Sequence, residues 1–279
     1  MVTKNSNISI YLRIISYSVL AFTLAFLINN VLTVWSDWPG IKKIFSHHEM
    51  FGYKKKALEG SDLNYGYMQI GLYLICIAAV VFYVFKTYSQ TLEQDSKILS
   101  RFSAYLVRSS FWAVFLVGVA DFVISFMVVE RLWEAIFSPE VKALMVKAPV
   151  RITYIHFPII LISFVIGYFT KSVGFIWLAV LVVVSEFVIV LSRFIFSYEQ
   201  AFQGDLVRFW YAALYLFASA YALIHEGHVR VDVLYSSFSE KKKAWTNMVG
   251  SAVLGVPLTL IVIFLGLNGK ASIINGPVV

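Results

Sequence analysis

Seven long runs of apolar residues constrain the fold of this chain more than any other feature of its sequence. They cover approximately residues 14–35, 66–85, 109–129, 152–170, 172–192, 206–224 and 245–267. Each run has about 20 residues, the length that an α-helix needs to cross the roughly 30 Å hydrocarbon core of a bilayer. Backbone amides in lipid must be satisfied inside their own segment, and the runs are too uniformly apolar for barrel strands. The sequence therefore predicts an all-α integral membrane protein, a bundle of about seven transmembrane helices.

Composition and charge support this class and indicate the expected surroundings. Hydrophobic residues make up 59% of the 279 residues and charged residues 14%, against about 25% charged residues in an average soluble domain. The net charge of +7 does not indicate nucleic acid, because basic residues of membrane proteins gather at cytoplasmic loops and anionic headgroups. No nucleic-acid module interrupts the runs. We therefore expect membrane lipid, and no nucleic acid, among the partners.

The segment between the second and third runs, residues 86–108, is mostly polar. Its apolar residues include Leu92, Ile98, Leu99 and Phe102. We interpret it as a short surface helix that lies in the plane of the membrane interface and leads into the third run.

Ionisable residues inside the apolar runs are candidate functional positions, because a charge in hydrocarbon needs a partner or a wet cavity. Asp121 lies near the middle of the third run. Two interpretations stay open for it: a protonated or hydrogen-bonded carboxyl that fixes helix packing, and part of a polar pathway. Glu186 and Arg193 are seven residues apart, which is two helical turns, so they share one face of the fifth predicted helix.

The fourth run contains His156 and Pro158. A proline in the middle of a helix removes one backbone hydrogen bond and usually kinks the chain. A haem-binding membrane anchor would show two histidines on facing helices at matching depth, whereas His225 and His228 lie in a loop. We therefore interpret His156 as a packed side chain and predict no cofactor.

Catalytic and metal sites are not expected. No segment has the pattern of a phosphate-cradling glycine loop, and no Ser/His/Asp or Cys/His constellation is present. His47 and His48 are adjacent, so they point to different sides of a helix or strand, and no third ligand follows at a suitable spacing. The sequence therefore indicates no enzyme, no catalytic residue and no metal site.

The longest strongly polar stretch in the last third of the chain joins the sixth and seventh runs, from Leu223 to Trp245. Charged and apolar residues alternate within it, so Arg230 and Asp232 share a side of any extended segment. An Arg–Asp pair at the membrane surface is a polar clasp between two membrane helices.

Three motifs in this part of the chain resemble one known family. They are Leu191-Ser-Arg-Phe-Ile-Phe, then Glu226-Gly-His-Val-Arg-Val-Asp-Val-Leu-Tyr235, and then Phe238-Ser-Glu-Lys-Lys-Lys-Ala-Trp. A polar elbow and an apolar span lie between the first two. Together they resemble the small permease subunit of tripartite ATP-independent periplasmic (TRAP) transporters, in particular the longer subunits of the mannitol and chloroaromatic group. The resemblance spans about residues 173–267.

The resemblance implies roles for individual residues. Arg193 falls on the family's arginine at the end of its first helix, and His228, Arg230 and Asp232 fall on its loop signature, which is cytoplasmic in the family. The acidic pair of many members is present here only as Gly204-Asp205. The candidates for partner contact or for a structural role are Glu186, Arg193, Asp205, Glu226, His228, Arg230 and Asp232.

The resemblance also implies a function, partners and a location. Such a subunit binds no substrate itself and acts as a scaffold in the bacterial inner (cytoplasmic) membrane, where it is multi-pass. It supports a large TRAP permease subunit, which carries out sodium-driven uptake of an organic acid or a similar small solute. A periplasmic substrate-binding protein delivers that solute.

The resemblance divides the chain into two parts. We expect residues 1–171 to be an N-terminal extension with about four transmembrane helices. Residues 172–279 would be a TRAP small-permease-like module of three helices, without the family's fourth.

Two alternatives stay open. One is a membrane anchor subunit of a respiratory oxidoreductase, which requires bound haem or quinone. The other is a self-sufficient channel or carrier that uses Asp121 and Glu186. Transporter cores tend to contain paired broken helices rich in glycine and proline, and only Pro158 and Pro257 come near that pattern. This favours an auxiliary subunit.

Overall fold

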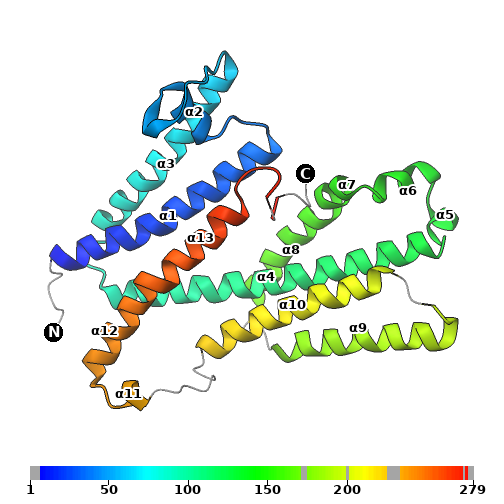
Figure 1. The fold of residues 1–279 in the computed structure, drawn as a ribbon. Coiled ribbons are helices and arrows are strands. Elements are labelled where there is room, and N and C mark those ends of the chain that lie inside the picture. The colour runs from blue at the N-terminus through cyan, green and yellow to red at the C-terminus, as the bar shows by residue number, and fades with distance from the viewer. Residues whose placement is uncertain (1–6, 171–174, 199–200, 225–232, 273, 276–279) are drawn as a thin grey trace. The chain divides into compact units, whose positions relative to one another are not determined.

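A computed structural model describes residues 7–170, 175–198, 201–224, 233–272 and 274–275 of the chain. Every regular element in these residues is helical, which confirms the all-α prediction (Figure 1). In chain order the elements are α1 (Asn7–Trp35), α2 (Ile41–His47), η1 (Met50–Gly52), α3 (Ser61–Lys86), α4 (Leu92–Val129), α5 (Trp133–Ile136), α6 (Pro139–Met145), α7 (Ala148–Arg151), η2 (Ile152–His156), α8 (Phe157–Phe169), α9 (Phe175–Phe196), α10 (Ala201–Ile224), α11 (Val233–Ser236), α12 (Glu240–Gly250), η3 (Ser251–Gly255) and α13 (Val256–Gly266).

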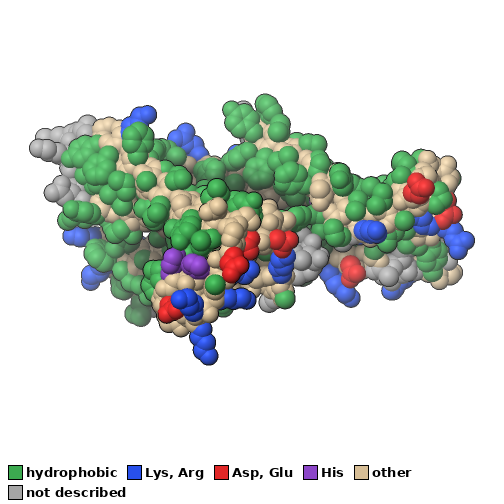
Figure 2. Space-filling model, turned by 90° about the horizontal axis from the view of Figure 1, so that it is seen from above, with side chains coloured by type: hydrophobic (Ala, Val, Ile, Leu, Met, Phe, Trp, Pro, Cys, Tyr) green, Lys and Arg blue, Asp and Glu red, His purple; other side chains and the backbone are tan. Residues whose placement is uncertain are grey.

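Helices form at all seven predicted runs. Among the described residues, five helical segments are long and apolar enough to cross a membrane: Ile8–Trp35, Ser61–Lys86, Leu92–Val129, Pro149–Phe169 and Glu240–Gly266. The fifth and sixth runs form α9 and α10, which have 22 and 24 residues. At about 1.5 Å per residue both exceed the roughly 30 Å of hydrocarbon. Figure 2 shows hydrophobic side chains over much of the visible surface, as expected for helices that face lipid.

The predicted surface helix before the third run is not a separate element. Helix α4 is continuous over 38 residues from Leu92 to Val129, so the amphipathic start and the apolar run form one rod. The prediction of a short helix in the interface plane was therefore wrong. No proline or glycine stands between Leu92 and Val117, so nothing in this part of the sequence ends the helix.

The contacts within the chain divide it into two compact units. One contains Met1–Lys97 and Val233–Val279, and the other contains Ile98–Asp232. The boundary that the family resemblance predicts at residue 171 is a different kind of division, and it stays a prediction.

In the first unit, α1 packs against α3 and α13. Edge-to-face rings join Tyr17 to Tyr83 at 5.4 Å between centroids, and Phe26 to Phe264 at 4.5 Å. Such ring pairs add about 0.5–1.5 kcal/mol each beyond the area that they bury. The last helix of the chain is thus packed on its first.

The first unit also buries an ion pair that the sequence pattern did not indicate. The Arg13 side chain is fully buried in α1, and its Nε donates to Asp95 Oδ2 in α4 at 2.5 Å. Its two terminal nitrogens donate to the carbonyl and the hydroxyl of Thr87 at 2.9 and 2.8 Å. Each of the three guanidinium nitrogens of Arg13 thus has an acceptor, and the Asp95 carboxylate compensates its buried positive charge.

In the second unit, α4 lies against α8 and α10 through small residues. A Cβ built on Gly167 of α8 would lie 2.4 Å from Ser109 Oγ and 2.9 Å from the Ser109 backbone. A Cβ on Gly118 would lie 2.4 Å from Trp210 Nε1 of α10. Small residues at these crossings allow the close backbone approach that stabilises helix pairs in lipid.

Both prolines inside apolar runs follow a π-helical turn. Ile152–His156 precedes Pro158, and Ser251–Gly255 precedes Pro257. Proline has no N–H for the carbonyl four residues earlier and collides with it, and a wider turn relieves both problems. Each run therefore continues as a helix beyond its proline.

Candidate functional site

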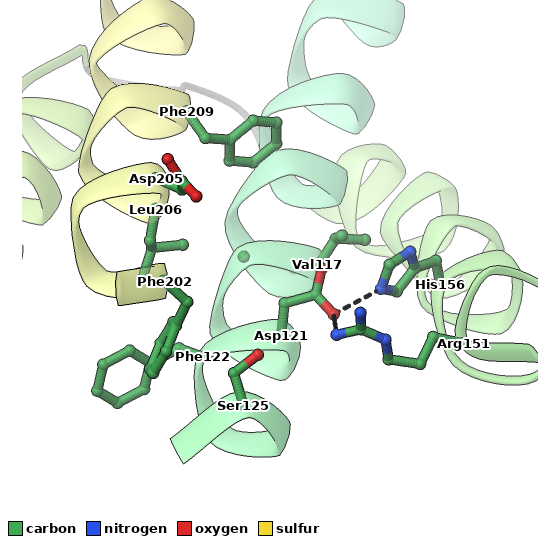
Figure 3. A pocket seen from close by; sticks show the side chains of 11 residues that line it. Val117, Asp121, Phe122, Ser125, Arg151, His156, Phe202, Asp205, Leu206 and Phe209 are labelled. Atoms are coloured by element: carbon green, nitrogen blue, oxygen red, sulfur yellow. Dashed lines mark hydrogen bonds and ion pairs between the residues drawn. The ribbon is translucent and has the colours of Figure 1, made fainter. Parts of the chain in front are cut away.

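The carboxylate of Asp121 is the centre of the polar cluster in the second unit. Arg151 Nη1 donates to Asp121 Oδ1 at 3.3 Å, and His156 Nε2 lies 3.0 Å from the same oxygen (Figure 3). Asp121 comes from α4, Arg151 from the end of α7 and His156 from the end of η2. The cluster therefore connects the third and fourth apolar runs.

The π-helical turn explains how Arg151 and His156 come together. Hydrogen bonds in such a turn run between residues five apart, so positions 151 and 156 lie above one another on the helix. Pro158 favours this turn because its ring collides with the carbonyl of Tyr154. The proline therefore shapes the turn that carries His156.

The cluster is partly shielded from solvent. The side chains of Arg151, His156 and Asp121 are 24%, 16% and 35% exposed. Arg151 uses Nη1 for Asp121, while its buried Nε has no hydrogen-bond partner among the described residues. Asp121 thus has hydrogen-bonding groups from the next span, as the helix-packing interpretation requires.

A pocket of about 400 Å³ opens beside this cluster. One side has the three polar residues Asp121, Arg151 and His156, and the other has residues of α10 (Figure 3). The remaining lining residues are Val117, Gly118, Phe122, Ser125, Phe202, Asp205, Leu206 and Phe209. Chemically, the pocket offers hydrogen-bonding groups on the side of Asp121, and both aromatic rings and the Asp205 carboxylate on the side of α10. No group of three metal-ligating side chains gathers anywhere in the described ranges.

The structure brings together two of the predicted candidates at this pocket, Asp121 and Asp205. Asp205 also accepts a hydrogen bond from Arg208 at 3.2 Å on the exposed side of α10. Glu186 and Arg193 lie on α9, are exposed and do not line the pocket. Glu226, His228, Arg230 and Asp232 lie outside the described residues, so the predicted Arg230–Asp232 clasp stays a prediction.

Sequence reasoning missed Arg151 as a member of the cluster. It stands just before the fourth run, where a basic residue is usually counted as a loop charge. The available signal was the spacing of five residues between Arg151 and His156, which lies two residues before Pro158. That spacing matters only if the turn is π-helical, which the sequence pattern did not indicate.

Comparison with known proteins gives one match. Residues 180–277, about a third of the chain, match the family model for the DctQ component of tripartite ATP-independent periplasmic transporters. No curated protein and no solved structure matches the chain. The match covers most of α9, all of α10 and the elements from α11 to α13. This match confirms the resemblance predicted from the motifs: residues 180–277 are similar to the DctQ component, the small permease component of TRAP transporters, and we name these residues the DctQ segment.

Proposed function

We propose that this chain is the small membrane subunit of a TRAP-type secondary transporter. The observation that carries the proposal is the DctQ match over residues 180–277. The subunit acts as a scaffold for a large permease in the bacterial inner membrane. That permease takes up an organic acid or a similar small solute with sodium, after a periplasmic binding protein has delivered it. The chain itself catalyses no reaction.

The outer face of α9 is a suitable surface for the large permease. The side of α9 that is buried in the protein carries Ser185 and Ile189, which are 8% and 9% exposed. The opposite side is a stripe of exposed apolar residues at helical spacing, Ile176, Val180, Val183, Phe187, Val190 and Phe194. By the helical period, Glu186 and Arg193 flank this stripe on one edge. Charged groups beside an apolar membrane face favour a protein partner over lipid.

The N-terminal region is suited to stabilise the position of the last helix, α13. We infer that residues 1–171 form an extension and residues 172–279 form the small-permease module. Helix α1 contacts α13 of that module through the Phe26–Phe264 ring pair. Asn30 Nδ2 also donates to the Leu267 carbonyl at 2.7 Å, and Lys270 bonds to Asp37. The extension therefore holds the last helix of the module.

The experiment is transport in proteoliposomes. A large TRAP permease is reconstituted with or without this chain, an inward sodium gradient is applied, and a binding protein loaded with labelled organic acid is added outside. We expect uptake only when both membrane proteins are present. Equal uptake without this chain would contradict the scaffold function.

A carrier function is the second candidate, because the 400 Å³ pocket holds Asp121 inside one unit of the chain. Glu186, the other residue of that hypothesis, does not line the pocket. Flux through liposomes that contain this chain alone would favour the carrier, particularly if Asp121→Asn abolished it. No flux is expected if the chain is a scaffold.

A further inference from the structure

A second hollow lies in the first unit and belongs to none of the sites described above. It is a groove of about 660 Å³ between α1, α2, α3 and α13. Its wall combines an apolar part, which includes Phe22, Leu74 and Phe264, with a polar part, which includes Asn29 and Lys42. A groove with these two characters along one membrane helix matches an amphipathic occupant.

The apolar part faces the interior of the predicted spans. Phe22 packs against Tyr73 with ring centroids 5.2 Å apart and against Phe264 at 6.0 Å. Leu74 borders the same space and is 63% exposed. Rings and aliphatic groups without a protein cover are a suitable surface for an acyl chain, because they bury apolar area on contact with it.

The polar part lies at the end of α1, where the membrane interface is expected. Trp35 is the last residue of this helix, and tryptophan is enriched at headgroup depth. Lys42 is exposed at the start of α2, and its Nζ donates to Asn268 Oδ1 at 2.6 Å, which fixes its position. Asn29 lines the groove, and its buried Oδ1 has no hydrogen-bond partner among the described residues, so its amide gains a partner if it turns toward a ligand hydroxyl.

The length and charge of the groove identify the occupant. Phe22 and Asn30 are eight residues apart on α1, about 12 Å along the helix axis at 1.5 Å per residue. The groove therefore extends from headgroup depth well into the hydrocarbon. At its mouth the Lys42 ammonium is exposed, whereas the Lys270 ammonium is already bonded to the Asp37 carboxylate. The local charge is positive.

We propose that this groove binds an anionic phospholipid with a hydroxyl-bearing headgroup, of the phosphatidylglycerol class. One acyl chain lies along Phe22, Leu74 and Phe264, the phosphate lies at the Lys42 ammonium, and a headgroup hydroxyl donates to Asn29 Oδ1. Binding there would tie α13 to α1 and α3. The proposal does not depend on the identity of the large permease.

The test uses the full-length chain in detergent, titrated with palmitoyl-oleoyl phosphatidylglycerol or with phosphatidylcholine of the same chains. Bound lipid is counted by native mass spectrometry. We expect preferential binding of phosphatidylglycerol, and Lys42→Glu should lower its affinity about fivefold or more, because one cation near the phosphate is lost. Lys43→Glu is the matched control, since Lys43 has the same charge but does not line the groove.

The acyl chain is tested separately by filling the groove. Leu74→Trp should reduce binding strongly, whereas Ile75→Trp should not, because Ile75 is 69% exposed, close to the 63% of Leu74, but lies outside the lining. Unchanged helical circular dichroism and a single elution peak verify folding of all four variants. Equal binding of the two lipids, equal effects of Lys42→Glu and Lys43→Glu, or binding that survives Leu74→Trp would each overturn the proposal.

Discussion

Single charged side chains inside the helices carry the most specific interactions of this chain. Asp121, Arg13 and Asp95 each lie in a helix that is long and apolar enough to span a membrane. Asp121 contacts Arg151 and His156, and Arg13 contacts Asp95. Charge in a poorly solvated site must be compensated, so each contact joins two segments that the apolar pattern alone does not connect.

Replacing the central carboxylate should loosen the second unit. Asp121→Ala leaves Arg151 and His156 without their common acceptor in a partly shielded site, and we expect a loss of about 1–3 kcal/mol in the free energy of unfolding. Thermal unfolding in detergent measures it. Asp205→Ala is the control, because its pair with Arg208 is largely exposed and should contribute about 0–1 kcal/mol. Equal losses in the two variants would show that the contacts of Asp121 contribute no more stability than an exposed ion pair.

The buried pair of the first unit should be more costly to break. Asp95→Ala leaves the fully buried Arg13 guanidinium without its carboxylate partner, and we expect a loss of about 3–5 kcal/mol in the free energy of unfolding. Lys97→Ala removes one partner of the exposed Glu93–Lys97 pair and should change stability by no more than about 0.5 kcal/mol. Chemical denaturation with both variants tests this, and a neutral Asp95→Ala would contradict the assigned burial.

At the scale of elements, close helix crossings hold the second unit together. The crossing of α4 and α8 has no room for a side chain at Gly167, since an added Cβ would meet the backbone of Ser109. Gly167→Ala should therefore destabilise the chain by about 1–3 kcal/mol. Gly71→Ala in α3 is the control, because nothing lies within 4 Å of its added Cβ and alanine favours the helix. Thermal unfolding of the two variants should move in opposite directions.

The segment after α13 is connected to the end of α1 by a titratable pair. Lys270 lowers the pKa of the Asp37 carboxyl, mainly by a hydrogen bond and then by its charge, with a smaller contribution from Lys43. Because the folded pKa is depressed, the pair favours the folded state above the ordinary aspartate pKa of about 3.9, and this contribution is lost as pH falls through the lowered pKa. Lys270→Ala should return the Asp37 pKa toward about 3.9 in a carboxyl NMR titration, and Lys43→Ala should shift it less. An unchanged pKa in Lys270→Ala would contradict the pair.

Individual elements also show which structural features can be predicted from the sequence and which cannot. Each apolar run became a helix because length and uniform hydrophobicity leave the backbone no other way to satisfy its hydrogen bonds. Pro158 was expected to disturb the helix of its run, and the structure has a π-helical turn directly before α8, which contains this proline. Local pattern does not determine that choice, and neither does it reveal pairs such as Arg13 with Asp95, whose members are far apart in sequence. The predicted roles of Glu186 and Arg193 stay predictions, because they concern a partner.

At the scale of the whole molecule, the contacts divide the chain into two units, whereas the division at residue 171 that the family resemblance suggests stays a prediction. The first unit combines the N-terminal helices with the last part of the DctQ segment, and α9 and α10 belong to the second. The DctQ segment is therefore shared between units. We propose that α1 and α3, which belong to the same unit as α13, are part of the scaffold for the large permease.

Co-purification tests the scaffold proposal most directly. The tagged chain is co-expressed with a large TRAP permease, extracted in mild detergent and sized by chromatography with light scattering. We predict one stable complex, which Glu186→Lys at the edge of the outer face of α9 weakens and Glu140→Lys on α6 leaves intact. Elution of the chain without the permease, under conditions in which both remain folded, would contradict the account.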